Sequence, residues 1–242
     1  MKKQETYIGL DLHRKSIYGT AMDKEGALLI AHKFPNNKEA LQEFLKPFHP
    51  AETKIAIEAC GFWRSCHFML RSLGFEATLA NPLKCHQIVK DKKTDKVDSK
   101  VLADLLRINY LPSVYLPSDD IISLRDLTRH RCMLADERRR IQVRLKSYLR
   151  REGIEYKDAV WNKKGIAWLA SLQNEKIDDL LAVYSAMCQR EQAVIQKLKK
   201  RALKKEISLL MTIPGIGVIG ATLIYAEIGD ITRFHSPKKL HS

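Results

Sequence analysis

The sequence predicts an α/β domain in the N-terminal half of the chain, followed by long basic helices. Up to about residue 112, short apolar strand signals alternate with amphipathic helix signals, and beyond it apolar residues recur at helical spacing over long stretches. Charge is the third observation, because 42 Lys and Arg against 28 Asp and Glu give a net charge of +14. We divide the chain into residues 1–112, 113–204 and 205–242.

The elements of the first part follow from local patterns. Alternating apolar residues predict strands, the turn DKEG joins the second strand to the third, and Asn37 can cap the first helix. Because three consecutive strands precede alternating helices and strands, we expect a mixed sheet covered by helices. The expected strands are 6–12, 16–22, 27–34, 54–59 and 76–80, and the expected helices are 38–48, 63–73 and 97–109.

The second part predicts helices without strands. Ser118 or Asp119 can cap a long helix that runs towards Arg151, and a second helix is expected at 178–200. The irregular stretch 155–174 separates the two. Apolar residues at three- and four-residue spacing are typical of a helical hairpin or coiled-coil arm, and also of two amphipathic helices in a compact domain.

The segment IPGIGVIGA predicts a tight turn between two helices. Pro214 ends a helix near Met211, Gly215 and Gly217 permit the turn, and residues 218–227 resume as a helix. This is the pattern of a helix-hairpin-helix, whose exposed backbone N–H groups hold a phosphate without reading base sequence. A glycine turn between packed helices is the structural alternative.

Positive charge is concentrated in two runs, at 129–151 and 197–205. Charge this dense is unfavourable unless a polyanion neutralises it, and phosphate contacts add salt-sensitive affinity. We therefore expect nucleic-acid binding, although a single run is more often a solvated helix face. The residues expected to contact nucleic acid are Arg138, Arg139, Arg140, Arg144, Lys199, Lys200, Gly215 and Gly217.

Several classes of protein do not fit this sequence. No apolar stretch reaches the roughly 18 uninterrupted residues of a membrane-spanning helix, and the N-terminus lacks an apolar signal core. The five cysteines are scattered and never spaced C-x-x-C, which indicates reduced thiols. The pairs Cys66-His67 and Cys85-His86 lack the spacing of a zinc site. We therefore expect a cytoplasmic protein without membrane contact.

Four carboxylates in the first part occupy unusual positions. Asp11 lies inside the apolar strand IGLDLH and Glu58 ends the strand in IAIEAC, where a carboxylate is unfavourable unless it faces solvent, is paired or binds a cation. Asp95 and Asp98 share one face at the start of a helix, where the helix dipole also favours acids. Each has a structural explanation by itself. If the four converge, hard divalent cations would lie between them, and a two-metal site serves phosphodiester chemistry.

These residues resemble a known family. The segments IGLDLH, AIEACG and KTDKVDSKVLADLL resemble a RuvC-like (RNase H fold) DEDD domain. The whole chain, including TIPGIGVIGATLIYAEIGDITRF, resembles the IS-one-ten transposases of bacterial insertion sequences. The resemblance implies a RuvC-like domain, a coiled-coil arm and a small all-α transposase domain. It also implies that Asp11, Glu58, Asp95 and Asp98 are catalytic ligands of Mg²⁺ or Mn²⁺.

The activity implied by the resemblance is DNA transposition. Such proteins cleave and transfer strands of donor and target DNA, guided by a structured RNA from the element, as a dimer or tetramer in the bacterial cytoplasm at the nucleoid. The family also uses a serine nucleophile whose context neither Ser236 nor Ser242 matches, so we expect a C-terminally truncated chain. A RuvC-like endonuclease acting on branched DNA and a catalytically inactive nucleic-acid-binding remnant are the alternatives.

Overall fold

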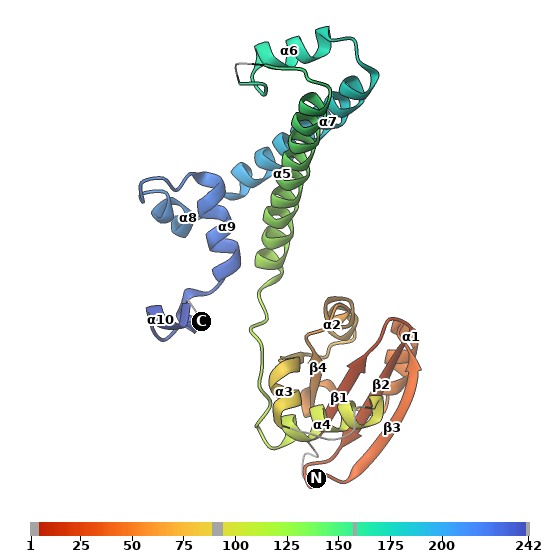
Figure 1. Cartoon of the computed structure of the whole chain (residues 1–242). Coiled ribbons are helices and arrows are strands. Elements are labelled where there is room, and N and C mark those ends of the chain that lie inside the picture. The colour runs from red at the N-terminus through yellow and green to blue at the C-terminus, as the bar shows by residue number, and fades with distance from the viewer. Residues whose placement is uncertain (1–4, 89–93, 157–158, 241–242) are drawn as a thin grey trace. The chain divides into compact units, whose positions relative to one another are not determined.

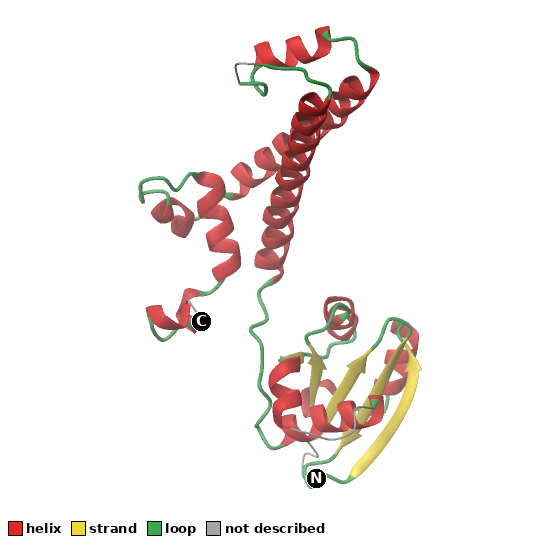
Figure 2. Cartoon of the chain, in the orientation of Figure 1, coloured by secondary structure: helices red, strands yellow, loops and turns green. Residues whose placement is uncertain are grey.

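The computed structural model describes residues 5–88, 94–156 and 159–240, so Ser242 lies outside the described residues. The chain forms two compact units, Met1–Leu116 and Pro117–Ser242, called here the first and second units (Figure 1). Every named strand belongs to the first unit, and the described part of the second unit is helical (Figure 2). Our finer division of the chain at residues 112 and 204 stays a prediction.

The first unit contains a five-stranded mixed sheet in the order β3-β2-β1-β4-β5. The central strand β1 is antiparallel to β2 and parallel to β4, so the predicted mixed sheet is confirmed. Each observed strand begins and ends within about one residue of its predicted range. The strands are β1 (Thr6–Leu12), β2 (Ser16–Met22), β3 (Leu28–Pro35), β4 (Thr53–Glu58) and β5 (Ala77–Ala80).

Helices cover the sheet, and strand alternation decides which side chains face which helix. Ile8 and Leu10 of β1 pack in one core cluster with Leu41 of α1 and Leu70 of α2. On the opposite face, Ala56 of β4 packs with residues of α4. The helices of this unit are α1 (Lys38–Leu45), α2 (Trp63–Ser72), α3 (Pro82–Ile88) and α4 (Asp95–Arg107), with a 3₁₀ turn at Pro50–Glu52.

Helix α3 is not among the helices expected for this part of the chain, which were 38–48, 63–73 and 97–109. Its seven residues bury only Cys85, so the segment is too short to show a helical period. The side chain of Asn81 accepts a hydrogen bond from the backbone N–H of Lys84 and supports the first turn.

Helix α4 approaches the sheet closely at Gly9 of β1. A Cβ at this position would lie 2.0 Å from the carbonyl oxygen of Ser99 and 2.6 Å from the backbone nitrogen of Ala103, both on α4. Only glycine fits here, and its absent side chain lets α4 pack directly on β1. The buried hydroxyls of Ser99 and Thr20, 2.7 Å apart, join the same helix to β2.

In the second unit, α5 (Asp119–Arg151) and α7 (Glu175–Arg201) pack against each other in opposite directions. Leu124 near the start of α5 belongs to the same cluster as Leu198 near the end of α7. Leu145 near the end of α5 clusters with Ile177 near the start of α7. The apolar spacing therefore corresponds to a real contact between the two helices.

The remaining helices of the second unit are short. Helix α6 (Lys163–Ser171) lies in the stretch that we expected to be irregular, and its cap at Asn162 is the signal that we overlooked. Helices α8 (Lys205–Leu210) and α9 (Val218–Ile228) flank the glycine turn, followed by a 3₁₀ turn at Ile231–Arg233 and α10 (Pro237–Leu240). Among the described residues, no helix is long and apolar enough to cross a membrane.

Candidate functional site

Asp11 lies near the end of the central strand, on the sheet face that α4 covers. It is two residues beyond Gly9, so strand alternation places both on the same face. Asp11 is only 6% exposed. Leu10 of β1 pairs with Ile57 of β4, so the next residues along these two parallel strands are Asp11 and Glu58, the last residue of β4. Because neighbouring parallel strands in register point their side chains to the same face, Asp11 and Glu58 share one face of the sheet.

The other two predicted carboxylates come from the first turn of α4. The side chain of Thr94 caps this helix by accepting a hydrogen bond from the backbone N–H of Val97. Asp95 and Asp98 are therefore at the helix end where the dipole stabilises negative charge. The close packing of α4 at Gly9 brings this turn over the end of β1.

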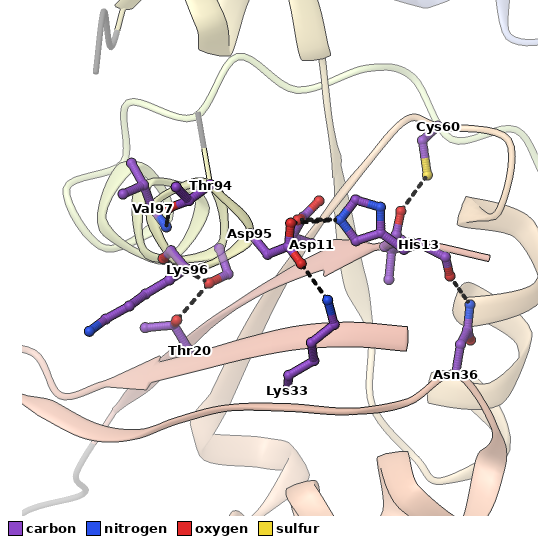
Figure 3. A network of polar contacts seen from close by, with 12 residues as sticks. Asp11, His13, Thr20, Lys33, Asn36, Cys60, Thr94, Asp95, Lys96 and Val97 are labelled. Carbon is purple, nitrogen blue, oxygen red and sulfur yellow. Dashed lines mark hydrogen bonds and ion pairs between the residues drawn. The ribbon is translucent and has the colours of Figure 1, made fainter. Parts of the chain in front are cut away.

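His13 bridges the two elements. Its Nε2 atom lies 3.1 Å from Oδ2 of Asp11 and 3.1 Å from Oδ1 of Asp95 (Figure 3). Lys33, from β3, places its Nζ atom 2.7 Å from Oδ2 of Asp95. Among the described residues, Asp11, His13 and Asp95 each offer a ligand atom within 4.8 Å of the others. We call these three residues the carboxylate–histidine cluster.

The two aspartates of the cluster have opposite electrostatic surroundings. Burial raises the pKa of Asp11, and the negative charges of Asp98 and Asp95 add to this effect, while the neighbouring His13 opposes it. For Asp95, the hydrogen bond from Lys33 lowers the pKa. Asp11 is thus a desolvated acid among like charges, whereas the charge of Asp95 is partly balanced.

Glu58 and Asp98 meet in a neighbouring cavity. This cavity, of about 370 Å³, lies between α3 and α4 and also touches Leu83, Cys85 and Val101. Burial raises the pKa of the Cys85 thiol, with a further contribution from the charge of Glu58. Glu58 and Asp98 lie outside the carboxylate–histidine cluster itself. The structure therefore brings Asp11 and Asp95 together, while Asp98, whose charge acts on Asp11, shares with Glu58 the lining of the neighbouring cavity.

This donor set fits a divalent cation. Carboxylate oxygens are the ligands that Mg²⁺ and Mn²⁺ prefer, and imidazole nitrogen also binds first-row transition metals. A cation beside Asp11 would offset both its desolvation and the repulsion from Asp95 and Asp98. The protein groups that already oppose this repulsion are His13 and, through Asp95, Lys33.

Arg138 differs from the other basic residues expected to contact nucleic acid, because it pairs with a buried carboxylate. Its Nε atom donates to Oε2 of Glu191 at 2.9 Å, and Arg131 contacts the other carboxylate oxygen of Glu191 at the same distance. Glu191 is 5% exposed. Arg138 thus joins α5 to α7 and is engaged inside the chain, which the charge run alone did not indicate.

The other basic residues lie on the surface. Arg139 and Arg140 are exposed and pair with Asp136 and Glu137 on their own helix, and such exposed pairs contribute little to stability. Arg144, Lys199 and Lys200 are exposed as well. These five cations can face a polyanion.

The glycine turn is exposed. Gly215 has φ +87°, a conformation that glycine adopts readily, and Gly217 is the N-cap residue of α9. A Cβ at either position would meet nothing within 4 Å. The turn lines a cavity of about 470 Å³ together with Thr128 and Arg131 of α5.

Two residues of the site were missed by sequence reasoning. His13 stands two residues after Asp11 in IGLDLH, a spacing that returns to the same side of an extended chain, and this signal could have indicated it. Lys33 gives no such signal, because its contact with Asp95 depends on the pairing of β3 with β2 and on the position of α4.

Two segments of the chain match known protein families. Residues 8–153, more than half of the chain, match the DEDD transposase family of the IS110 type, described as Transposase. Residues 207–242 match the family described as Transposase IS116/IS110/IS902 family.

Curated relatives carry transposase names in most cases. The transposase for insertion sequence element IS1328 of Yersinia enterocolitica is 26% identical over 96% of this chain and 71% of its own length. The putative transposase y4qE of Sinorhizobium fredii is 26% identical over 71% of this chain and 44% of its own length. The pilin gene-inverting protein of Moraxella bovis is 26% identical over 98% of this chain and 70% of its own length.

Among solved structures, T. thermophilus RuvC in complex with Holliday junction substrate shares 10% identity and a TM-score of 0.36, covering 46% of this chain and 99% of that chain. A likeness of this size carries no argument. The family matches do, and they confirm the resemblance recognised in the sequence: the chain belongs to the IS110 family of insertion-sequence transposases.

Proposed function

We propose that this chain cleaves and transfers DNA strands as a metal-dependent transposase, with Asp11, Glu58, Asp95 and Asp98 as the metal ligands of its catalytic centre. The observation that carries the proposal is the cluster at the end of the central strand, where ligand atoms of the buried Asp11 and of Asp95 lie within 4.8 Å of each other and the charge of Asp98 acts on Asp11. Family membership supplies the reaction class. The mixed sheet and its covering helices support assigning the first unit to the RuvC-like fold.

Divalent cations held here, Mg²⁺ or Mn²⁺, would activate a nucleophile and stabilise the leaving oxygen of a phosphodiester. The residues of the chain have distinct roles around them. Asp11 supplies a buried carboxylate on a rigid strand, so its position does not depend on a loop. Lys33 orients Asp95 by holding one of its oxygens. Asp98 and Glu58 line the adjoining cavity, where the DNA next to the scissile phosphate would lie.

The second unit is proposed to hold nucleic-acid backbone. Arg139, Arg140 and Arg144 on α5, with Lys199 and Lys200 on α7, contact phosphates, and the backbone N–H groups at Gly215 and Gly217 hold a further one. Arg138 also pairs with Glu191 of α7, and its contact with nucleic acid stays a prediction. We further propose that α5 and α7 form the coiled-coil arm that is expected for members of this family.

The assembly that would use these surfaces is also part of the proposal. Donor and target DNA and a structured guide RNA encoded by the element are the ligands, and the working form is a dimer or tetramer at the bacterial nucleoid. The two long basic helices favour this proposal, because one helix pair offers more cations than a single phosphate requires.

The test is a DNA cleavage and strand-transfer assay with Mg²⁺, run with and without co-purified RNA. The full chain is compared with Asp11→Asn and with Asp179→Asn, a matched change of an exposed aspartate on α7. We expect metal-dependent activity in the wild type and in Asp179→Asn, and at least a hundredfold less in Asp11→Asn. Equal activity of Asp11→Asn would overturn the assigned site.

The comparison with and without RNA, together with the choice of DNA substrate, distinguishes a transposase from an endonuclease. Cleavage that needs RNA and joins two DNAs supports the transposase. Cleavage of branched DNA without RNA and without strand joining would instead indicate a RuvC-like endonuclease.

A further inference from the structure

We infer that His13 is a nitrogen ligand of the metal centre and that the centre consequently prefers Mn²⁺ to Mg²⁺. The inference rests on the proposed function, because it adds a residue and a metal preference to that site. It concerns a side chain that lies outside the four carboxylates and that joins two of them.

The first support is the spacing of ligand atoms. Neighbouring ligands of an octahedral ion bound at about 2.1 Å lie about 3 Å apart. Nε2 of His13 is 3.1 Å from Oδ2 of Asp11 and 3.1 Å from Oδ1 of Asp95, and all three atoms lie within 4.8 Å of one another. The two distances from Nε2 thus match those between neighbouring ligands of one ion, and the two carboxylate oxygens both lie on the side of the imidazole that this nitrogen faces.

The second support is the way the backbone holds His13. Its carbonyl oxygen accepts a hydrogen bond from Nδ2 of Asn36 at 2.8 Å, and its N–H donates to the carbonyl oxygen of Ser16 at 2.9 Å. These contacts fix the residue just beyond the end of β1, with the imidazole directed at Asp11 and Asp95 (Figure 3). The side chain is 49% exposed, so the imidazole lies at the surface beside the buried Asp11.

The third support is the occupation of Asp95. The Nζ atom of Lys33 lies 2.7 Å from Oδ2 of Asp95, and the other oxygen, Oδ1, faces His13. Asp95 therefore offers one oxygen to an ion beside Asp11. The cluster is a set of two oxygens and one nitrogen, not a set of oxygens alone.

A mixed donor set has a predictable preference. Mg²⁺ favours oxygen ligands and is bound poorly by imidazole, whereas first-row transition ions accept both donors. Mn²⁺ is the weakest-binding of these ions, yet it still accepts a nitrogen ligand more readily than Mg²⁺ does. We expect Mn²⁺ to bind at least ten times more tightly than Mg²⁺, and this ratio to fall several-fold when the imidazole is removed.

The experiment uses Mn²⁺ alone as the probe, on the full chain. Electron paramagnetic resonance measures bound Mn²⁺ and its displacement by Mg²⁺, and electron spin echo modulation detects a nitrogen bound to it. The variants are His13→Gln, which keeps a polar side chain, His235→Gln, an exposed histidine of the second unit, and Asp11→Asn. Circular dichroism checks that each variant is folded.

We expect nitrogen modulation in the wild type and in His235→Gln, and none in His13→Gln. Modulation that persists in His13→Gln would overturn the inference, because another nitrogen would be the ligand. If the wild type shows no nitrogen modulation while Asp11→Asn abolishes Mn²⁺ binding, the inference fails and the proposed metal site stands. If the wild type binds no Mn²⁺, both fail.

Discussion

Two carboxylates are buried in the part of the chain that the structure describes, one in each unit, and their surroundings have opposite charge. Glu191 of α7, 5% exposed, lies between the guanidinium groups of Arg131 and Arg138. Asp11 of β1, 6% exposed, lies beside Asp95 and Asp98, and burial raises its pKa.

This difference is the one we expect between a structural carboxylate and the metal ligand proposed here. Glu191 is neutralised within the chain by two arginines, so its burial requires no other partner. The like charges around Asp11 oppose folding, and such an arrangement is expected where a ligand of opposite charge binds. Burial alone therefore does not distinguish the two acids, and the sign of the neighbouring charges is the observation that favours Asp11 as the metal ligand.

The largest effect is expected at Gly9, which brings the acids of the first unit together. In Gly9→Ala the added Cβ would meet backbone atoms of α4 at 2.0 and 2.6 Å, so the helix must move. We expect a loss of about 3 kcal/mol in the stability of this unit. Hydrogen exchange of peptides from β1 and α4 measures it.

The control for this change is Gly61→Ala, because a Cβ at Gly61 would meet nothing within 4 Å. Equal protection in the two variants would show that the close packing of α4 on β1 does not hold the site together.

The next effect concerns Glu191. In Glu191→Gln the two arginines lose their shared anion, and the pairing of α5 with α7 should weaken by about 2 kcal/mol, less than for a fully buried pair because both arginines are partly exposed. Hydrogen exchange in α5 and α7 is the measurement. Glu137→Gln, which removes an exposed pair with Arg140, should change it by less than about 1 kcal/mol.

If Glu191→Gln leaves exchange in α5 and α7 unchanged, the interpretation of Glu191 as a structural carboxylate is wrong.

The smallest effect is a pH dependence at Glu227 of α9. The hydrogen bond from Arg129 lowers the pKa of Glu227, so the pair stabilises the folded state above the unfolded pKa and this contribution is lost as pH falls through the folded pKa. The pair is largely exposed, and we expect less than about 1 kcal/mol. The stabilities of wild type and Glu227→Gln, measured by urea unfolding from pH 7 to pH 3, should converge at the acid end. A constant difference across this range would contradict the assignment.

Local sequence patterns were sufficient to predict most of the fold. Strand alternation located β1, β2 and β4, and the caps at Asn37 and Ser118 located the starts of α1 and α5. Helices α3 and α6 were missed because short segments with few buried residues show no clear period.

The candidate site was predictable only as far as each residue was unusual in its own segment. An acid inside an apolar strand is such a signal, and it indicated Asp11. The contacts of Lys33 with Asp95 and of Arg138 with Glu191 join residues 62 and 53 positions apart, so they depend on packing that no local pattern contains.

The most direct test of the account is the thermal stability of wild type and Asp11→Asn, each with and without saturating Mg²⁺, with Asp179→Asn as the control. Without Mg²⁺, removing a buried charge from among like charges should stabilise the variant by about 1 kcal/mol. With Mg²⁺ at a hundred times its Kd, binding should add about 2.7 kcal/mol to the wild type and far less to the variant, so the order of stability reverses. If Mg²⁺ stabilises Asp11→Asn as much as the wild type, Asp11 does not hold the cation and the proposed metal centre is wrong.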